Sequence, residues 1–196
     1  RLRRDDSWPW PWPRPRPLDP PKETRYRFVT TSTAIVPDGA GKSRLFHTSE
    51  ELTPGDGPFL RLARSLVLET PPGPPSIAES VAVSALAATG RERRRAAVLL
   101  LGGGAVDEGS VDAARVRRYL SRLRVPLHVW RTSREEVPAA VDWPGAVDAS
   151  TIEAMARAFD ALRADLATQR ILWVDGRLDP ARISLTGRAT GFAEAR

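Results

Sequence analysis

Two kinds of apolar pattern alternate along the second half of the chain: short continuous runs, and longer stretches at helical spacing. The short runs are rich in valine and leucine, which predicts strands buried on both faces, as in a parallel sheet. The stretches between them predict amphipathic helices, so the segment is typical of a βαβ unit. In chain order the predicted elements are a strand at Ala96–Leu101, a glycine turn at Gly102–Gly104, a helix from Ser110 or Asp112 to Leu123, and a strand at Val125–Trp130.

The pattern before this unit predicts a strand hairpin and two helices. The β-branched and aromatic run Tyr26–Val36 is typical of a strand or a bent strand pair. Ser76–Glu79 has the form of a capping box, which predicts that Ser76 opens a helix. The other elements predicted here are a turn at Pro37–Gly41, a strand at Arg44–His47, a short helix at Phe59–Leu68 and a helix end at Gly90.

The pattern after the unit predicts one more helix and two more strands. Ser150–Glu153 is a second capping box, and the helix that it opens is expected to run to about Thr168. An apolar run at Ile171–Val174 predicts a strand, with a hairpin turn at Asp175–Gly176 and a return strand at Ile183–Leu185. Alternating strands and helices joined by right-handed crossovers predict an α/β fold, a doubly wound three-layer sandwich with a mainly parallel sheet.

Residues 1–24 form a separate proline-rich tail ahead of a domain expected at residues 25–196. Proline occupies every second position through much of the tail, which removes amide donors and favours an extended, polyproline-II-like backbone. Trp8, Trp10 and Trp12 alternate with these prolines, and a solvated linker does not need such large side chains. The indoles are therefore expected either to pack on the domain or to bind another protein, because aromatic anchors carry much of the binding energy at interfaces.

Composition narrows the possible function classes. The 196 residues include 30 Lys+Arg against 24 Asp+Glu, a net charge of +6, but the positive residues are dispersed and most have acids nearby. Nucleic-acid binding is therefore not expected. The chain has no cysteine, which excludes disulfides, cysteine metal sites and a cysteine nucleophile. It also has no apolar run of membrane-spanning length and no signal-peptide pattern.

Two glycine-containing turns invite a nucleotide-binding interpretation, and both lack the required spacing. The sequence Gly41-Lys42-Ser43 is similar to the end of a phosphate loop, but Val36 stands where that loop needs its first glycine. The turn Gly102–Gly104 is similar to a dinucleotide turn, but Asp107 stands where the third glycine belongs. No nucleotide or other organic cofactor is therefore expected.

Acidic residues supply candidates for a metal site, while the histidines supply no candidate for catalysis. Asp107, Glu108 and Asp112 carry the carboxylates that hard cations prefer, although acids near a helix start also stabilise the helix dipole. Asp107 and Glu108, with Ser76, are the candidate metal ligands of a non-standard site. His47 and His128 have no Ser, Cys or acid at a motif spacing, so no catalytic residue is assigned.

From about Tyr26 to Val174 the elements resemble those of the von Willebrand factor A (VWA) domain. The run RRRAAVLLLGGG stands where that family has a strand ending in Thr-Asp-Gly, and GPPSIAESVAVSAL stands where it has Gly-Thr-x-Ile and a helix. The runs RRYLSRLRVPLHVW and TQRILWVDGR are similar to a divergent bacterial VWA-related group found in exported proteins.

VWA domains bind a divalent cation at a metal-ion-dependent adhesion site, and this chain departs from all three elements of that site. The first element, DxSxS, has no match, since Asp5–Ser7 lacks the spacing. The loop threonine of the family falls at Pro74–Pro75, and its aspartate falls at Gly102–Gly103. The resemblance therefore implies a degenerate adhesion site.

The function expected from these features is that of a non-catalytic protein-interaction domain or accessory subunit of a larger assembly. The expected location is periplasmic or otherwise extracytoplasmic. The expected partners are other protein subunits, including those of a membrane-associated complex, with the tail tryptophans as docking residues. The alternative is a divalent-metal-dependent adhesion domain with the non-standard site. A sheet without its usual first strand would also leave a position for strand addition by the tail, by the segment near Ile183 or by a partner.

Overall fold

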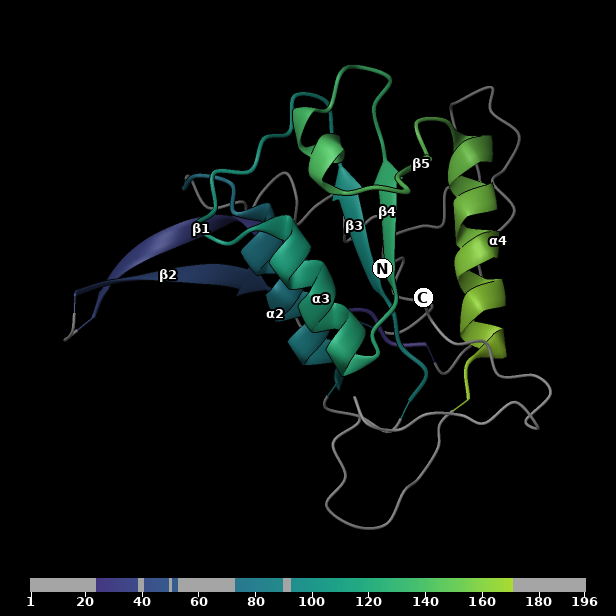
Figure 1. Cartoon of the computed structure of the whole chain (residues 1–196), viewed down its shortest axis with the longest axis horizontal. Helices are drawn as coiled ribbons and strands as arrows, with labels where there is room; N and C mark the ends of the chain where they lie inside the picture. The colour runs from purple at the N-terminus through teal and green to yellow at the C-terminus, as the bar shows by residue number, and fades with distance from the viewer. Residues whose placement is uncertain (1–23, 39–40, 50, 53–72, 90–92, 171–196) are drawn as a thin grey trace, which may run out of the picture.

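The computed structural model describes residues 24–38, 41–49, 51–52, 73–89 and 93–170, with residues 33–38 and 41–45 described by their backbone alone. Within these ranges the chain has an α/β fold with a parallel sheet of three strands and a separate antiparallel hairpin (Figure 1). The elements in chain order are β1 (Val29–Asp38), β2 (Gly41–Thr48), α2 (Ile77–Thr89), β3 (Ala97–Leu101), α3 (Ala113–Leu123), β4 (Leu127–Arg131), the 3-10 helix η1 (Pro138–Asp142), β5 (Val147–Asp148) and α4 (Ile152–Thr168).

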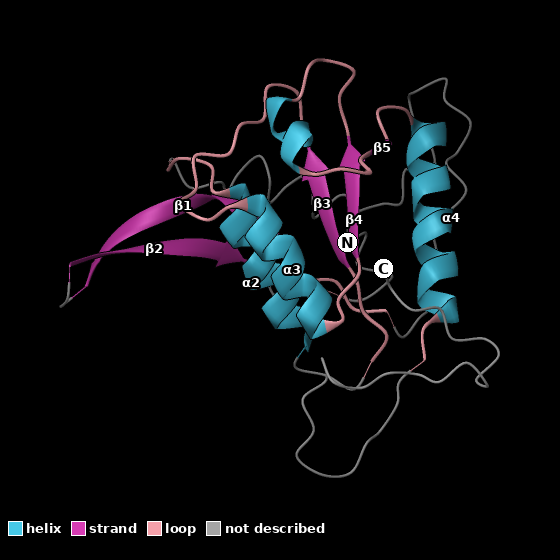
Figure 2. Cartoon of the chain, viewed as in Figure 1, coloured by secondary structure: helices cyan, strands magenta, loops and turns pink. Residues whose placement is uncertain are grey.

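The parallel sheet has the strand order β3-β4-β5, and helices cover both of its faces (Figure 2). Alternate residues of β3 point to opposite faces, so that Leu99 packs with α2 and α3 while Leu100 packs toward α4. On the α4 face, Trp130 is only 3% exposed. It meets Phe159 edge to face, with ring centroids 4.8 Å apart. Coverage on both faces accounts for the apolar residues of β3 apart from Val98, which is exposed.

Helix α3 begins and ends at the residues that the sequence predicts. The side chain of Asp112 accepts a hydrogen bond from the amide of Ala114 and caps the helix. At the other end Arg124 takes a left-handed conformation with φ of 54°, and its amide bonds to the carbonyls of the last turn.

Helix α4 begins one residue later than the capping box predicts. Its N-cap is Thr151, whose hydroxyl accepts from the amide of Ala154 at 3.1 Å. Ser150 therefore lies outside the helix, and its amide donates to Asp148 at 3.0 Å. The prediction of Ser150–Glu153 as a box was wrong by this one residue, because the side chain of Asp148 at the end of β5 accepts from the Ser150 amide.

The hairpin β1–β2 confirms the predicted strand pair. Its antiparallel register runs from Val29↔Thr48 to Asp38↔Gly41 with an irregularity after Val29. The predicted turn at Pro37–Gly41 was too long, since pairing continues to Asp38 and Gly41. Gly41-Lys42-Ser43 thus lies in a strand and is no phosphate loop.

Two elements, η1 and β5, have no counterpart among the predicted ones. β5 is only two residues long and pairs with the end of β4 through Trp130↔Val147 and Arg131↔Asp148. Several predicted elements lie outside the described residues: Phe59–Leu68, Gly90, Ile171–Val174, Asp175–Gly176 and Ile183–Leu185. The described helices include none with the length and apolar character that crossing a membrane requires.

Candidate functional site

The three metal candidates of the sequence come together at the start of α2. Both oxygens of the Asp107 carboxylate accept hydrogen bonds from this helix, Oδ1 from the amide of Ile77 and Oδ2 from the amide of Ala78, each at 2.9 Å. Oδ1 also accepts from the amide of Gly109 at 2.9 Å. The first amides of a helix lack intrahelical partners and carry a partial positive charge, so a carboxylate here stabilises the helix.

Ser76 and Glu79 do not form the reciprocal capping box that the sequence predicts. The amide of Ser76, which a closed box would pair with the Glu79 carboxylate, donates instead to the carbonyl of Thr31 at 2.7 Å. Oε1 of the Glu79 carboxylate accepts from the amide and the hydroxyl of Ser110, at 2.7 and 3.0 Å, while Oε2 is buried without a hydrogen-bond partner among the described residues. The prediction that Ser76 opens this helix is confirmed, since α2 begins at Ile77 and the amide of Ser80 donates to the carbonyl of Ser76 at 3.0 Å. Only the Glu79 half of the box was wrong, because Ser110, from a loop distant in sequence, donates to that carboxylate.

This environment sets the charge state of Glu79. Burial raises the pKa of its carboxyl, but the hydrogen bonds from the amide and the hydroxyl of Ser110, together with the nearby amides of Glu79 itself and Val111, outweigh that effect. The net result is a pKa below the usual 4.5. Glu79 is therefore ionised at neutral pH and joins the loop after β3 to α2.

Glu108 takes part in this junction through its backbone, since its amide donates to the carbonyl of Pro75 at 2.8 Å while its side chain is exposed. Asp107, Glu108 and Ser76, the residues of the non-standard metal site considered from the sequence, are thus neighbours. Within the described ranges, no group of three or more His, Cys, Asp or Glu side chains is placed to hold a metal ion.

The glycine turn after β3 lies exposed at the carboxyl edge of the sheet, where parallel α/β folds place their sites. Gly104 has φ of +67°, and its amide bonds to the carbonyl of Glu136 at 3.0 Å. A side chain at Gly103 would collide with the side chains of Glu135 and Ser133. The turn is therefore shaped by packing against the loop after β4, and it presents no side chain of its own.

The carboxyl ends of the neighbouring strands add polar groups at this edge of the sheet. Asp148, at the end of β5, has a lowered pKa because the hydroxyl and the amide of Ser150 lie beside its carboxylate, the amide donating to Oδ1 at 3.0 Å, and because Arg131 and Arg134 lie near. A carboxylate with a lowered pKa is a weak base, so Asp148 is poorly suited to proton abstraction.

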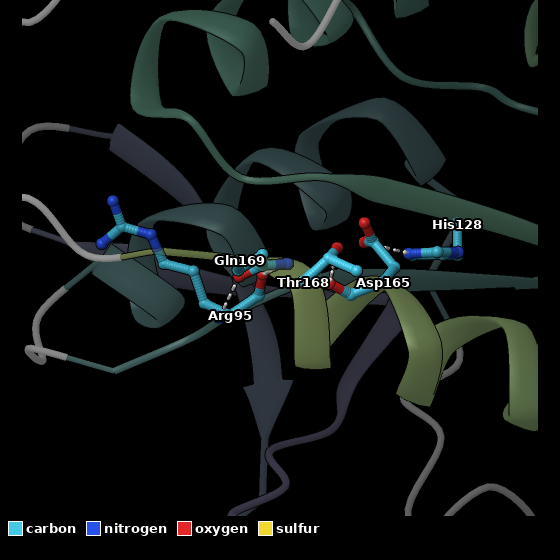
Figure 3. Close-up of polar contacts among 5 residues, drawn as sticks. All are labelled: Arg95, His128, Asp165, Thr168 and Gln169. Atoms are coloured by element: carbon cyan, nitrogen blue, oxygen red, sulfur yellow. Dashed lines mark hydrogen bonds and ion pairs between the residues drawn. The ribbon is translucent and has the colours of Figure 1, made fainter. Parts of the chain in front are cut away.

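A second polar cluster ties α4 to the sheet (Figure 3). His128, predicted to face a helix or a loop end, does face one: its Nε2 lies 3.1 Å from Oδ2 of Asp165 on α4. No sequence motif marks this pair, because 37 residues separate its members.

Arg95 completes the cluster at the amino end of β3. Its guanidinium donates to the carbonyls of Thr89 and Leu123, the last residues of α2 and α3, at 3.4 and 3.1 Å. A cation at two helix C-termini is favoured by both helix dipoles. Its backbone pairs with the side chain of Gln169. These contacts join the ends of α2, α3 and α4 to the segment that enters β3.

Trp8, Trp10 and Trp12 lie outside the described residues. Comparison with models of protein families, with curated proteins and with solved structures found no match to this chain.

Proposed function

We propose that this chain is a VWA-like, doubly wound three-layer α/β domain that acts as a non-catalytic protein-interaction module or accessory subunit of a larger periplasmic or otherwise extracytoplasmic assembly. The observation that carries the proposal is the double hydrogen bond from α2 to the Asp107 carboxylate. An acidic residue after the first strand of the parallel sheet is where chemistry is expected in such folds. Here both carboxylate oxygens of Asp107 accept hydrogen bonds from backbone amides at the start of α2.

The polar groups nearby support the same interpretation. The carboxylate of Glu79 is engaged by Ser110, and the strand β3 ends in glycines. A fold that retains its sheet and helices while its loop acids bind backbone amides is suited to presenting a surface.

Exposed apolar side chains near the carboxyl edge offer part of such a surface. Val141 of η1 is 86% exposed, and Val147 of β5 and Ile152 of α4 are 50% and 55% exposed. Single exposed apolar residues are ordinary, but these belong to consecutive elements. Together with the tryptophans of residues 1–24 they are the contacts that we assign to a protein partner.

The proposal is tested by using the full chain as bait and comparing the proteins that the unaltered chain and its variants recover from the native source. Replacing Trp8, Trp10 and Trp12 by alanine should remove proteins that the unaltered chain recovers, because the indole anchors are lost, and should leave the denaturation midpoint unchanged. The matched control replaces the same three residues by phenylalanine and should retain part of the recovery. An unchanged set of recovered proteins, or an alanine variant that does not fold, would overturn the docking role of the tail.

The convergence of Asp107, Glu108 and Ser76 at the start of α2 favours one alternative, a divalent-metal-dependent adhesion domain. Calorimetric titration with Mg²⁺ and with Mn²⁺ separates the two proposals. Saturable heat that Asp107→Asn abolishes would support the adhesion domain, and the absence of heat for both ions would remove it.

A further inference from the structure

Helix α3, which lies in front of α2 in Figure 1, turns a row of arginines away from the core. Val116 and Leu120 of this helix are each 2% exposed and pack in the cluster that includes α2 and β3. Arg115, Arg118 and Arg122 are exposed. Positions three and four residues apart lie on the same side of a helix, so these three arginines form one row opposite the core. The row spans two turns, about 10 Å along the helix axis.

No acidic residue of α3 balances this row of charge. Residues 113–124 contain neither aspartate nor glutamate. Within the described part of the chain, no carboxylate forms an ion pair with any of the three arginines. Helix α4 differs in this respect, because Nη1 of Arg163 lies 3.8 Å from Oδ1 of Asp160, three residues earlier. The exposed face of α3 is therefore a concentrated positive surface.

The stability of α3 does not account for the row. Like charges three or four residues apart on a helix repel each other. The positive end of the helix dipole also disfavours a cation in the first turn, where Arg115 lies. Solubility is served as well by charges of mixed sign. A row of cations that opposes the stability of its own helix is suited to binding negative charge.

The residue types on this face fit a protein partner. Tyr119 lies among the arginines and is 36% exposed. Tyrosine and arginine are enriched at protein interfaces, where lysine is depleted. A guanidinium also binds a carboxylate through two parallel hydrogen bonds. The spacing of about one helical turn between the arginines matches carboxylates that repeat every three or four residues on a partner helix.

Two other negatively charged partners fit the face less well. A helix that lies on a lipid bilayer inserts its apolar side, whereas the apolar side of α3 is buried in the core. A nucleic-acid duplex extends well beyond a row about 10 Å long. Its phosphates would also meet the exposed carboxylate of Asp112 at the start of the helix.

We propose that the exposed face of α3, formed by Arg115, Arg118, Tyr119 and Arg122, binds an acidic helix of a partner protein. The guanidinium groups would pair with carboxylates of that helix, and the ring of Tyr119 would pack against the aliphatic stems of its glutamates. This inference rests on the proposed function, since it assigns to the interaction module one binding surface and the chemistry of the partner that the surface takes.

NMR titration of the full chain with a synthetic helical peptide tests the proposal. The peptide repeats glutamate every three or four residues along one face and carries alanine elsewhere, and the salt concentration is about 0.15 M. We expect the backbone amide signals of residues 115–122 to shift until they saturate. The signals of Arg157 and Arg163, exposed arginines of α4, should stay in place. The absence of any shift, or equal shifts on α3 and α4, would overturn the proposal.

A triple variant tests the contribution of the guanidinium groups. Arg115→Gln, Arg118→Gln and Arg122→Gln together should weaken binding of the peptide at least about tenfold, because the charged hydrogen bonds to its carboxylates are lost. Glutamine is a good helix former, so the denaturation midpoint should be unchanged. The titration of the unaltered chain decides the question if this variant does not fold.

The matched control removes the same amount of charge from another helix. Arg157→Gln, Arg163→Gln and Arg170→Gln, all at exposed positions of or next to α4, also lower the net charge from +6 to +3, since three cations are lost. Distant charges are screened at this salt concentration, so the control should weaken binding by less than about threefold. Equal weakening by the two triple variants would overturn the proposal, because net charge alone would then explain the binding.

Two further measurements separate this inference from its alternatives. Tighter binding of a DNA duplex, or of vesicles that contain phosphatidylserine, than of the peptide would overturn the assignment to a protein helix. With the α3 triple variant as bait, proteins that bind this face should be lost from the recovered set. If the variant recovers the same proteins as the unaltered chain while the tryptophan variant loses them, the α3 inference alone fails. If neither variant changes the recovered set, the proposed function fails as well.

Discussion

The side chain of Gln169 pairs with the backbone of Arg95 across 74 residues of sequence. Its carbonyl oxygen accepts from the Arg95 amide at 3.0 Å, and its amide nitrogen donates to the Arg95 carbonyl at 3.1 Å (Figure 3). The end of α4 is thereby fastened to the segment that enters β3.

Gln169→Ala should lower the free energy of unfolding by about 1–3 kcal/mol, because two partly buried backbone groups of Arg95 lose their partner. Denaturant titration at neutral pH measures the change. The neighbouring Arg170→Ala is the matched control, since Arg170 contacts only exposed carbonyls at the end of α4. It should change stability by no more than about 0.5 kcal/mol. Equal effects of the two substitutions would contradict the structural role of Gln169.

Asp107→Ala should destabilise the protein by about 1–2 kcal/mol, because the first two amides of α2 lose their cap. Asp107→Asn should retain part of the stability, since one amide oxygen still accepts. Urea denaturation of both variants gives the two values. Glu108→Ala, at an adjacent exposed side chain, is the control and should be near neutral. If the asparagine variant is less stable than the alanine variant, the capping role is wrong.

Glu79→Gln should be less stable than the unaltered protein at pH 7 and should approach it at low pH. The pKa of Glu79 is lowered in the folded state, so its carboxylate contributes stability that is fully present above the usual value of 4.5. That contribution is lost as the pH falls through the lower, folded-state pKa. Denaturation at pH 7 and pH 3 measures how the gap narrows. A gap that is constant across this range would show that Glu79 does not act through its charge.

Gly104→Ala should cost about 1–2 kcal/mol, because φ of +67° is unfavourable for a residue with a Cβ atom. Gly102→Ala is the matched control two residues earlier, where an added Cβ meets nothing within 4 Å. Thermal unfolding of the two variants makes the comparison. Equal loss of stability in both would contradict the conformation of this turn.

Much of the parallel unit could be predicted from the sequence, because its signals are local. The run at β3 is apolar at every position, which is typical of a parallel strand covered by helices on both faces, although Val98 is exposed. Asp112 and Arg124 lie at the ends of α3, where capping chemistry acts within a few residues. The pairing of β5 could not be predicted, since two residues carry no periodic pattern and form a strand only against β4.

The sequence singled out Asp107, Ser76 and Glu79, but it did not predict the hydrogen bonds that they make. Asp107 was singled out as a metal candidate, and the structure engages it with the amides of Ile77 and Ala78, some thirty residues earlier. Ser76 and Glu79 form a local capping-box pattern, yet Glu79 binds Ser110. The local capping preference of Glu79 is weak, and hydrogen-bond donors that the fold brings within 3 Å of its carboxylate override it. Sequence spacing does not show which donors those are.

The sequence alone therefore determined the alternation of strands and helices, the hairpin and the absence of thiol chemistry. Those features depend on the order of apolar and polar residues, on turn residues and on composition, which act over a few positions. Only the tertiary structure decided that the acids after β3 hold α2, that His128 meets Asp165, and that Gln169 returns the chain to β3. These contacts join residues 29 to 74 positions apart, and they form because packing of the layers brings their elements together.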